Sequence, residues 1–295
     1  MYCGVWHQFL AEVEHNVELC SLQFNMATVA EIYFPQGELE KTFINCIWRS
    51  SESDVQQRKE IILPKGTVEI IFNLSDVINY NHPSLKFLAT APTVFINGIN
   101  FKPLELLKTG RHEFLGIQLN AIGLRLLFNF LPREFNDQVF EGKMICPELD
   151  LLAEELFCLM EFQQQVNLIF KWIYHKLKTI NDPYLLCRAA KLMSLKHQND
   201  LSVKKLSHEF CLSDRQLRRF SLEWLGMSTE EFILYNKYLH SLHLLHFEDQ
   251  SLTDTGLQAG YYDQSHFIRE FKSYTGLTPK QYKVAHGDVP GHIFE

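Results

Sequence analysis

The sequence predicts an α+β protein: a β-rich N-terminal domain, barrel-like or sandwich-like, then a helical connector, then an all-α C-terminal domain with two helix-turn-helix units. Three observations predict this fold class. Short β-branched and aromatic runs bounded by turn residues recur between residues 42 and 119. Leucine and aromatic residues recur at helical spacing from residue 148. Two similar helical segments in the last third repeat at an offset of 50 residues.

The length of 295 residues is enough for two domains that each bury a core. We expect a β-rich sensory or dimerisation domain at residues 1–147 and a helical connector at 148–197. A double helix-turn-helix domain follows at 198–285, with a C-terminal tail at 286–295.

The composition narrows the class of protein. No run of ~18 apolar residues is present, so we expect no transmembrane helix. The first residues have no basic region before an apolar core, so we expect no secretory signal. The seven cysteines are scattered without a Cys-x-x-Cys pair, which favours a reduced, cytoplasmic setting.

The net charge of the chain is −7, and residues 201–285 carry ten basic and ten acidic side chains. Nucleic-acid binding would therefore require the basic side chains of this segment to lie together on one face of the domain.

The N-terminal pattern predicts strands and one short helix. The expected strands are Thr42–Trp48, Glu60–Leu63, Thr67–Leu74, Thr93–Asn97 and Glu113–Leu119. A short apolar helix at Ala121–Phe130 follows and ends near Pro132. We expect no metal site among His7, Glu12 and His15.

For two polar residues of the β-rich domain, the sequence is compatible with more than one role. Glu69 lies in an apolar strand, where it either faces solvent by alternation, which we favour, or contacts a buried ligand. Asn97 either forms a turn with Gly98 or hydrogen-bonds a ligand. The region has no clustered His/Glu set and no nucleophile elbow, so we expect no enzyme, no metal and no cofactor.

The connector, Glu148–His197, is expected to be helical, with a break at 181–183 and a second helix at 184–195. Its Leu/Trp stripe serves either as intramolecular core, which we favour, or as the interface of a homodimer.

The first helix-turn-helix spans Leu201–Gly226. We expect a helix at Ser202–Phe210, a turn at 211–213 and a recognition helix at Arg215–Trp224. Leu217, Phe220 and Trp224 then face inward, which places Arg215, Arg218 and Arg219 outward. Three arginines on one face repel one another, so either an anion such as a phosphate backbone binds them, which we favour, or Asp214 and Glu223 offset their charge on a solvated face.

The second unit is built similarly. Asp263 is expected to cap a helix whose Phe267 and Phe271, four residues apart, face the core. Ser265, Arg269 and Lys272 then point away from the core, on a face that suits a DNA major groove.

A long helix, Thr229–Phe247, joins the units, and Ser228 with Glu231 forms a capping box. Its histidines His240, His243 and His246 are a loose metal signal, and we expect no metal there.

The run Gly260-Tyr-x-Asp-Gln-Ser-His-Phe-x-x-x-Phe-Lys, with Gly276-x-Thr-Pro-x-x-Tyr282, resembles the signature of the AraC/XylS family of bacterial transcription regulators, over about 201–283. Residues 33–119 look like the β-rich domain that precedes some of these DNA-binding regions. The resemblance implies two recognition helices, 215–224 and 264–272, in successive major grooves. Cys211, Ser221 and Thr229 depart from the pattern, where glycine, phenylalanine and proline are usual.

We therefore expect a sequence-specific DNA-binding transcription regulator. The side chains expected near phosphates are Lys204, Lys205, Arg215, Arg218, Arg219 and Lys272. The side chains expected to read bases are Arg215, Gln216, Arg219, Gln264, Ser265 and Arg269. The expected partners are double-stranded DNA, a small-molecule effector at the N-terminal domain, a second copy of the chain, and RNA polymerase if the protein activates. The alternative is a protein–protein adaptor in which the first helix-turn-helix has decayed.

Overall fold

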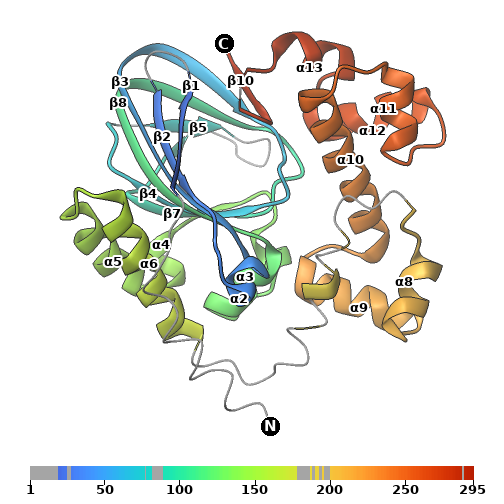
Figure 1. Ribbon diagram of the computed structural model, residues 1–295, viewed down its shortest axis with the longest axis horizontal. Coiled ribbons are helices and arrows are strands. Elements are labelled where there is room, and N and C mark those ends of the chain that lie inside the picture. The colour runs from blue at the N-terminus through green and yellow to red at the C-terminus, as the bar shows by residue number, and fades with distance from the viewer. Residues whose placement is uncertain are drawn as a thin grey trace.

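A computed structural model describes residues 19–24, 28–76, 78–81, 89–177, 187, 190–192, 195, 200–287 and 289–295. It contains a curved N-terminal sheet with helices on one side, and a C-terminal helical domain on the other (Figure 1). The α+β fold class predicted from the sequence is confirmed.

The sheet contains ten strands among the described residues, and all their pairings are antiparallel. They are β1 (Leu19–Phe24), β2 (Thr28–Tyr33), β3 (Ile44–Ile62), β4 (Val68–Asn73), β5 (Asn79–Asn81), β6 (Ala89–Thr90), β7 (Val94–Asn97), β8 (Leu104–Leu119), β9 (Val139–Glu141) and β10 (His292–Phe294). The main order is β1-β2-β3-β8-β4-β7-β9, while β10 pairs with β3, β5 with β8, and β6 with β5.

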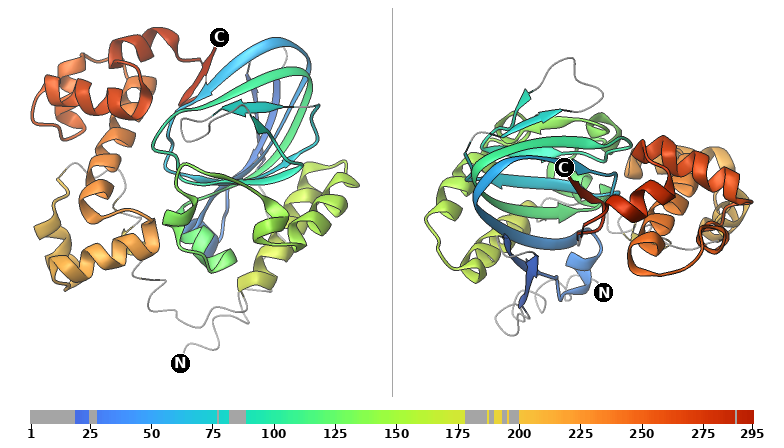
Figure 2. Two further views of the ribbon diagram at one scale, coloured as in Figure 1. Left: turned by 180° about the vertical axis from the view of Figure 1, so that it is seen from behind. Right: turned by 90° about the horizontal axis from the view of Figure 1, so that it is seen from above.

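Strands β3 and β8 form the spine of the sheet. They pair along most of their length, with register shifts between Glu52 and Val55 and between Val55 and Arg58. Such irregularities bend a strand and increase its twist. The sheet accordingly curls round on itself, as the view from above shows (Figure 2).

Helices also pack against the sheet, some of them on the side away from the C-terminal domain and some next to it (Figure 1). The N-terminal helices are α2 (Glu38–Lys41), α3 (Ala121–Phe128), the 3₁₀ turn η1 (Pro132–Phe135), α4 (Gly142–Ile145), α5 (Glu148–Phe157) and α6 (Phe162–Leu177). Helices α5 and α6 bury most of their apolar side chains within the chain, Leu152, Leu156, Ile169 and Trp172 among them, whereas Leu151 is exposed. The stripe predicted in the connector is therefore mostly core, and the expected homodimer stays a prediction. The expected break at 181–183 and most of the helix after it lie outside the described residues.

The C-terminal domain contains the two expected units. Its helices are α8 (Val203–Phe210), α9 (Asp214–Leu225), α10 (Thr229–Phe247), α11 (Leu252–Gln258), α12 (Gln264–Thr275) and α13 (Pro279–Ala285). After α13 the chain returns to the sheet and adds β10 to the end of β3 (Figure 1). The segment expected as a C-terminal tail thus ends in a strand.

Candidate DNA-binding surface

The first helix-turn-helix has the expected caps. Ser202 caps α8 by accepting the Lys205 N–H at 3.2 Å, and Ser213 caps α9 in a capping box with Gln216. The turn between them places Cys211 at φ 52°, in the left-handed region that favours glycine. Cys211 stands where glycine is usual, and its backbone therefore has a conformation that is unfavourable for a residue with a side chain.

The two faces of α9 separate as predicted. Leu217, Phe220 and Trp224 are buried, while Arg215, Arg218 and Arg219 are exposed.

Ser221, in place of the usual phenylalanine, is fully buried, and its Oγ lies 3.1 Å from Thr229 Oγ1. Thr229 itself stands where proline is usual, at the first position of α10. The two departures from the family pattern are therefore partners in one buried hydrogen bond.

The second unit repeats the arrangement. Asp263 caps α12 by accepting the His266 N–H at 2.8 Å. Phe267 and Phe271 are fully buried, whereas the side chain of Arg269 is 74% exposed and is 3.6 Å from Glu270. Ser265 and Lys272 are exposed on the same helix.

The repeat extends to the helix ends. Gly226 and Gly276 end the two recognition helices at φ 73° and 74°. Two residues further on, Ser228 with Glu231 and Thr278 with Gln281 form capping boxes for α10 and α13. Two copies of one local design therefore present two helices with basic outer faces.

All ten predicted contact residues are exposed: Lys204, Lys205, Arg215, Gln216, Arg218, Arg219, Gln264, Ser265, Arg269 and Lys272. Some have local partners. Lys205 Nζ is 2.6 Å from Asp200, and Gln264 Oε1 is 3.4 Å from Thr253 Oγ1. Gln216 Oε1 accepts from the Ser213 N–H at 3.0 Å, so the capping box uses the oxygen that a base contact would also use.

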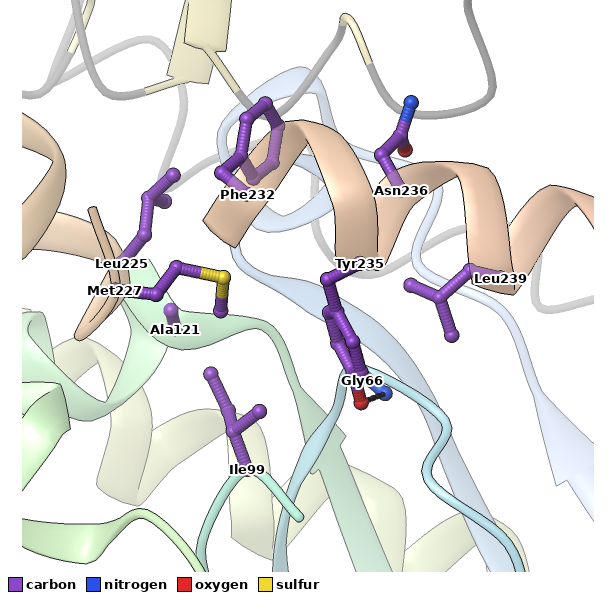
Figure 3. Close-up of a pocket in the computed structure, with 9 residues that line it drawn as sticks. All are labelled: Gly66, Ile99, Ala121, Leu225, Met227, Phe232, Tyr235, Asn236 and Leu239. Carbon is purple, nitrogen blue, oxygen red and sulfur yellow. Dashed lines mark hydrogen bonds between the residues drawn. The ribbon is translucent and has the colours of Figure 1, made fainter. Parts of the chain in front are cut away.

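The linking helix α10 is apolar on several sides because it packs against helices of both helix-turn-helix units and against the N-terminal domain. Tyr235 Oη accepts the Gly66 N–H at 2.9 Å (Figure 3). The same hydroxyl donates to the Asn100 carbonyl at 2.8 Å. Tyr238 Oη donates to the Pro64 carbonyl at 3.0 Å. A gap of about 20 Å³ remains beside Tyr235, which is room for about one water molecule. The domains are thus packed closely along this helix.

The end of α9 is also fixed to the N-terminal domain. The Arg125 guanidinium is 2.7 Å from the Glu223 carboxylate and lies 4.8 Å from the ring of Trp224. Asn136 Nδ2 donates to the Gly226 carbonyl at 2.8 Å. The first recognition helix therefore has a set orientation relative to the sheet.

The histidines of α10 have structural neighbours. His246 Nδ1 is 3.1 Å from Tyr282 Oη, and His243 packs on Phe247 at 4.8 Å between ring centres. In the described part of the chain, no group of three or more His, Cys, Asp or Glu side chains is arranged to hold a metal ion.

The curled sheet encloses a cavity of about 950 Å³. Its wall combines apolar side chains, including Trp48, Phe95 and Phe114, with buried charges. Glu69 is one of these: it is 5% exposed, lies 3.5 Å from Lys65 Nζ and accepts from Gln118 Nε2 at 3.0 Å. The favoured expectation that Glu69 faces solvent is wrong, because the concave side of β4 here lines a cavity instead of an apolar core.

Asn97 also lines the cavity. It is the last residue of β7, is buried, and accepts from Asn100 Nδ2 at 3.2 Å. The loop thus begins at Gly98, and Asn97 itself belongs to the strand that forms the cavity wall.

The charges of the cavity form a connected chain of pairs. Lys108 Nζ is 2.5 Å from Glu60 and 3.8 Å from Glu52, and Arg58 is 2.7 Å from Glu52. Burial alone would raise the pKa of Glu60, but Lys108 and His292 outweigh it and hold that pKa well below its usual range. These residues were not predicted as a site, although the dense charges of residues 49–60 were a signal.

None of the described helices is both long and apolar enough to cross a membrane.

Comparison with known families and proteins matches two parts of the chain. Residues 206–284 match a family described as a helix-turn-helix domain, and residues 31–141 match a domain of unknown function. An uncharacterised HTH-type transcriptional regulator of Staphylococcus aureus is 28% identical over 143 residues, which are 48% of this chain and 19% of that protein. One of Haemophilus influenzae is 30% identical over 86 residues, 29% of each chain. The match thus spans about a fifth of the length of the Staphylococcus relative.

Two solved structures resemble this chain at lower sequence identity than these relatives do. ToxT from Vibrio cholerae aligns with a TM-score of 0.45 and 12% identity, over 88% of this chain and 98% of ToxT. The DNA-binding domain of AdpA, solved with a target DNA, aligns with a TM-score of 0.31 and 20% identity, over 35% of this chain and 92% of that domain. The matched family, the motifs and the duplicated capping pattern identify residues 206–284 as an AraC/XylS-type helix-turn-helix domain, preceded in this chain by a β-rich domain of undefined role.

Proposed function

We propose that the protein is a sequence-specific DNA-binding transcription regulator that inserts α9 and α12 into successive major grooves. The observation that carries the proposal is the pair of exposed, arginine-bearing faces on two helices of the same design. A recognition helix in the major groove is the usual docking mode of a helix-turn-helix.

The roles of the side chains follow from their positions. Arg215 and Arg219 on α9, and Arg269 on α12, have the reach and fork geometry to bind guanine bidentately. Gln216, Gln264 and Ser265 lie in the first turns of their helices, where residues of a recognition helix approach bases. Lys204, Lys205, Arg218 and Lys272 would bind phosphates, which position the protein without reading sequence.

The cavity supports regulation by a small molecule. Its volume of about 950 Å³ is in the range of ligand pockets, and it mixes aromatic with polar side chains. The lining charges pair within the chain, as Arg49 does with Glu31, Lys65 with Glu69, and Lys108 with Glu60. A ligand with a net charge would have to break such a pair, which is costly when buried. The effector class that fits is therefore a neutral or zwitterionic molecule.

The proposal places the protein in the cytoplasm, with chromosomal DNA. Five cysteines are free thiols, which suits a reducing compartment: Cys46, Cys146, Cys158, Cys187 and Cys211.

The test is selection of genomic DNA fragments by the purified full chain, followed by fluorescence anisotropy on a selected duplex at low and moderate salt. Selective, salt-sensitive binding that Arg219→Ala and Arg269→Ala weaken would support the proposal. The matched control is Lys171→Ala, an exposed lysine on α6, a helix on the opposite side of the sheet from α9 and α12 (Figure 1). Enrichment of no sequence, with equal weak binding to all fragments, would contradict it and favour the adaptor.

A further inference from the structure

The last strand of the chain forms part of the cavity wall. β10 pairs with β3 so that His292 lies opposite Ile62 and Phe294 opposite Glu60. β3 in turn places Ile62 opposite Leu104 and Glu60 opposite Leu106 of β8. All six side chains line the cavity, so two rows of residues cross from β8 through β3 to β10 on its inner face. These rows are His292–Ile62–Leu104 and Phe294–Glu60–Leu106.

His292 connects the two groups of cavity charges. Its Nδ1 is 2.5 Å from Glu60 Oε1, and its Nε2 is 3.3 Å from Lys65 Nζ. The carboxylate can only accept and the ammonium can only donate, so a neutral ring with a proton on Nδ1 satisfies both. His292 therefore bridges the Lys65–Glu69 pair to the Glu60–Lys108 pair. Phe294 adds a second tie, since the Arg58 guanidinium lies 5.0 Å from its ring centre.

The backbone of this segment is held as well. Lys59 and Glu295 exchange both backbone hydrogen bonds, at 3.0 and 2.8 Å, and the Leu63 N–H donates to the Gly291 carbonyl at 2.8 Å. Gly291 has φ +74°, a conformation that side chains disfavour.

The other end of the segment leads into the second helix-turn-helix. The Gly291 N–H reaches Tyr282 Oη at 3.4 Å, and the ring of Tyr282 lies 5.8 Å from that of Phe271. Tyr282 is on α13 and Phe271 is the buried anchor of α12. Only a few residues thus separate the cavity wall from the core of the second recognition unit.

We propose that β10 couples the cavity to the second helix-turn-helix, so that a cavity occupant regulates DNA binding by moving this strand. The inference rests on the proposed function. Docked β10 ties α13 to the sheet through Gly291 and Tyr282, and Tyr282 packs on Phe271 of α12. Arg125 and Asn136 separately hold the end of α9, and Tyr235 and Tyr238 hold α10. Both recognition helices are then preorganised for adjacent grooves, which avoids an ordering cost on binding. An occupant that displaces His292 and Phe294 loosens the packing of α13 and α12 in the second unit and weakens DNA binding.

The test uses the full chain and a duplex selected by the wild-type protein. The double variant His292→Ala/Phe294→Ala is expected to bind that duplex at least fivefold more weakly, and hydrogen exchange in residues 279–287 is expected to be faster. Val284→Ala, on α13 and 85% exposed, is the control with unchanged affinity. An affinity of the double variant within twofold of wild type, or tighter, overturns the proposal. If the double variant lacks a cooperative melting transition, His292→Gln and Phe294→Leu decide by the same criterion.

A cavity-filling substitution tests the link to the cavity without a known ligand. Leu106→Trp extends into the cavity from the row that contains Phe294, and is expected to weaken DNA binding at least threefold in the wild-type background. In the double variant it should have no further effect, because the strand that transmits the change is already released. Equal effects in both backgrounds overturn the proposal. Failure of the wild-type protein itself to select any duplex would overturn the proposed function instead.

Discussion

Ser221 and Thr229 share a buried hydrogen bond of 3.1 Å between their hydroxyl oxygens, at the junction of α9 and α10. Both residues depart from the family pattern, and each compensates the other. A buried hydroxyl without a partner costs about 1–3 kcal/mol, so neither change alone is neutral.

This pairing predicts a non-additive mutant cycle. Ser221→Ala and Thr229→Val should each reduce the free energy of unfolding by about 1–3 kcal/mol, because each leaves one buried hydroxyl without a hydrogen-bond partner. The double variant should be more stable than the sum of the single losses predicts, since no unpaired hydroxyl remains. Urea unfolding measures the three values, and Thr229→Ser is the control that keeps the bond. Additive losses would show that the two hydroxyls act independently.

The arginines of the recognition helices should control sequence readout. Arg269→Ala is expected to lose about 1–3 kcal/mol of binding free energy on the selected duplex and to relax selectivity at one position, if it binds a guanine bidentately. Arg219→Ala should do the same at a position about one helical turn away, because the two units would occupy successive grooves. Anisotropy on a panel of single-base variants measures both effects. Loss of selectivity at the same base pair in both variants would contradict the two-groove arrangement.

Lysines on the same surface should instead control the salt dependence of binding. Each phosphate contact adds about 0.9 to the slope of log affinity against log salt concentration. Lys272→Ala should therefore reduce the slope by about 1 and weaken binding to all sequences alike. The slope is measured by anisotropy titrations between low and moderate salt, with Lys171→Ala as the control. A wild-type affinity that does not change with salt concentration would show that the protein makes no phosphate contacts.

The turn of the first unit offers a stabilising substitution. Cys211 has φ 52° and is exposed, and a side chain in this region costs about 1–2 kcal/mol. Cys211→Gly removes that strain, while the extra chain entropy of glycine cancels roughly 0.5–1 kcal/mol of the gain. A net increase of roughly 0.5–1 kcal/mol in the free energy of unfolding is expected from these two effects. Cys211→Ala keeps the Cβ and should give no such gain in the same urea experiment; equal stability of all three proteins would show that the turn is unstrained.

The C-terminal helices could be predicted from the sequence because their signals are local. Ser228 and Glu231, Asp263, and Gly276 mark helix ends through contacts within a few residues, and each stands at a helix end in the structure. The sorting of Leu217 and Arg219 to opposite faces follows from helical periodicity alone.

The sheet could be predicted only in part. The expected strands overlap β3, β4, β7 and β8, with the first two expected strands both in β3, but residues 49–59 and 104–112 were not predicted as strand. In those stretches Glu52, Arg58 and Lys108 point into the cavity, so the inner face is charged and the apolar alternation that marks a strand is lost.

Strand β10 had no sequence signal. It is three residues long, and its partner, Ile62, is more than two hundred positions away in the chain. A pairing of this kind depends on tertiary structure, and so does the cavity wall that it completes.

The buried charges of the cavity make stability depend on pH in two stages. Burial and the charge of Lys65 lower the pKa of His292 from its ordinary 6.5, so the folded state resists a proton that the unfolded state accepts. Stability should therefore fall as pH drops below about 6.5. The pKa values of Glu60 and Glu69 are also lowered in the folded state, because Lys65 and Lys108 outweigh the effect of burial. Their stabilisation is present above an ordinary value of 4.5 and is lost as pH falls below it.

The upper stage can be assigned by comparing variants. His292→Gln should flatten the loss of stability between about pH 7.5 and 5.5 and leave the loss below 4.5 in place, when urea unfolding is measured across this range. His112 and His240 also have lowered pKa values, through burial first, so the difference between wild type and variant isolates His292. Parallel curves for the two proteins would mean that His292 does not titrate differently in the folded and unfolded states. The link from Lys65 through His292 to Glu60 would then need a different protonation from the one proposed here.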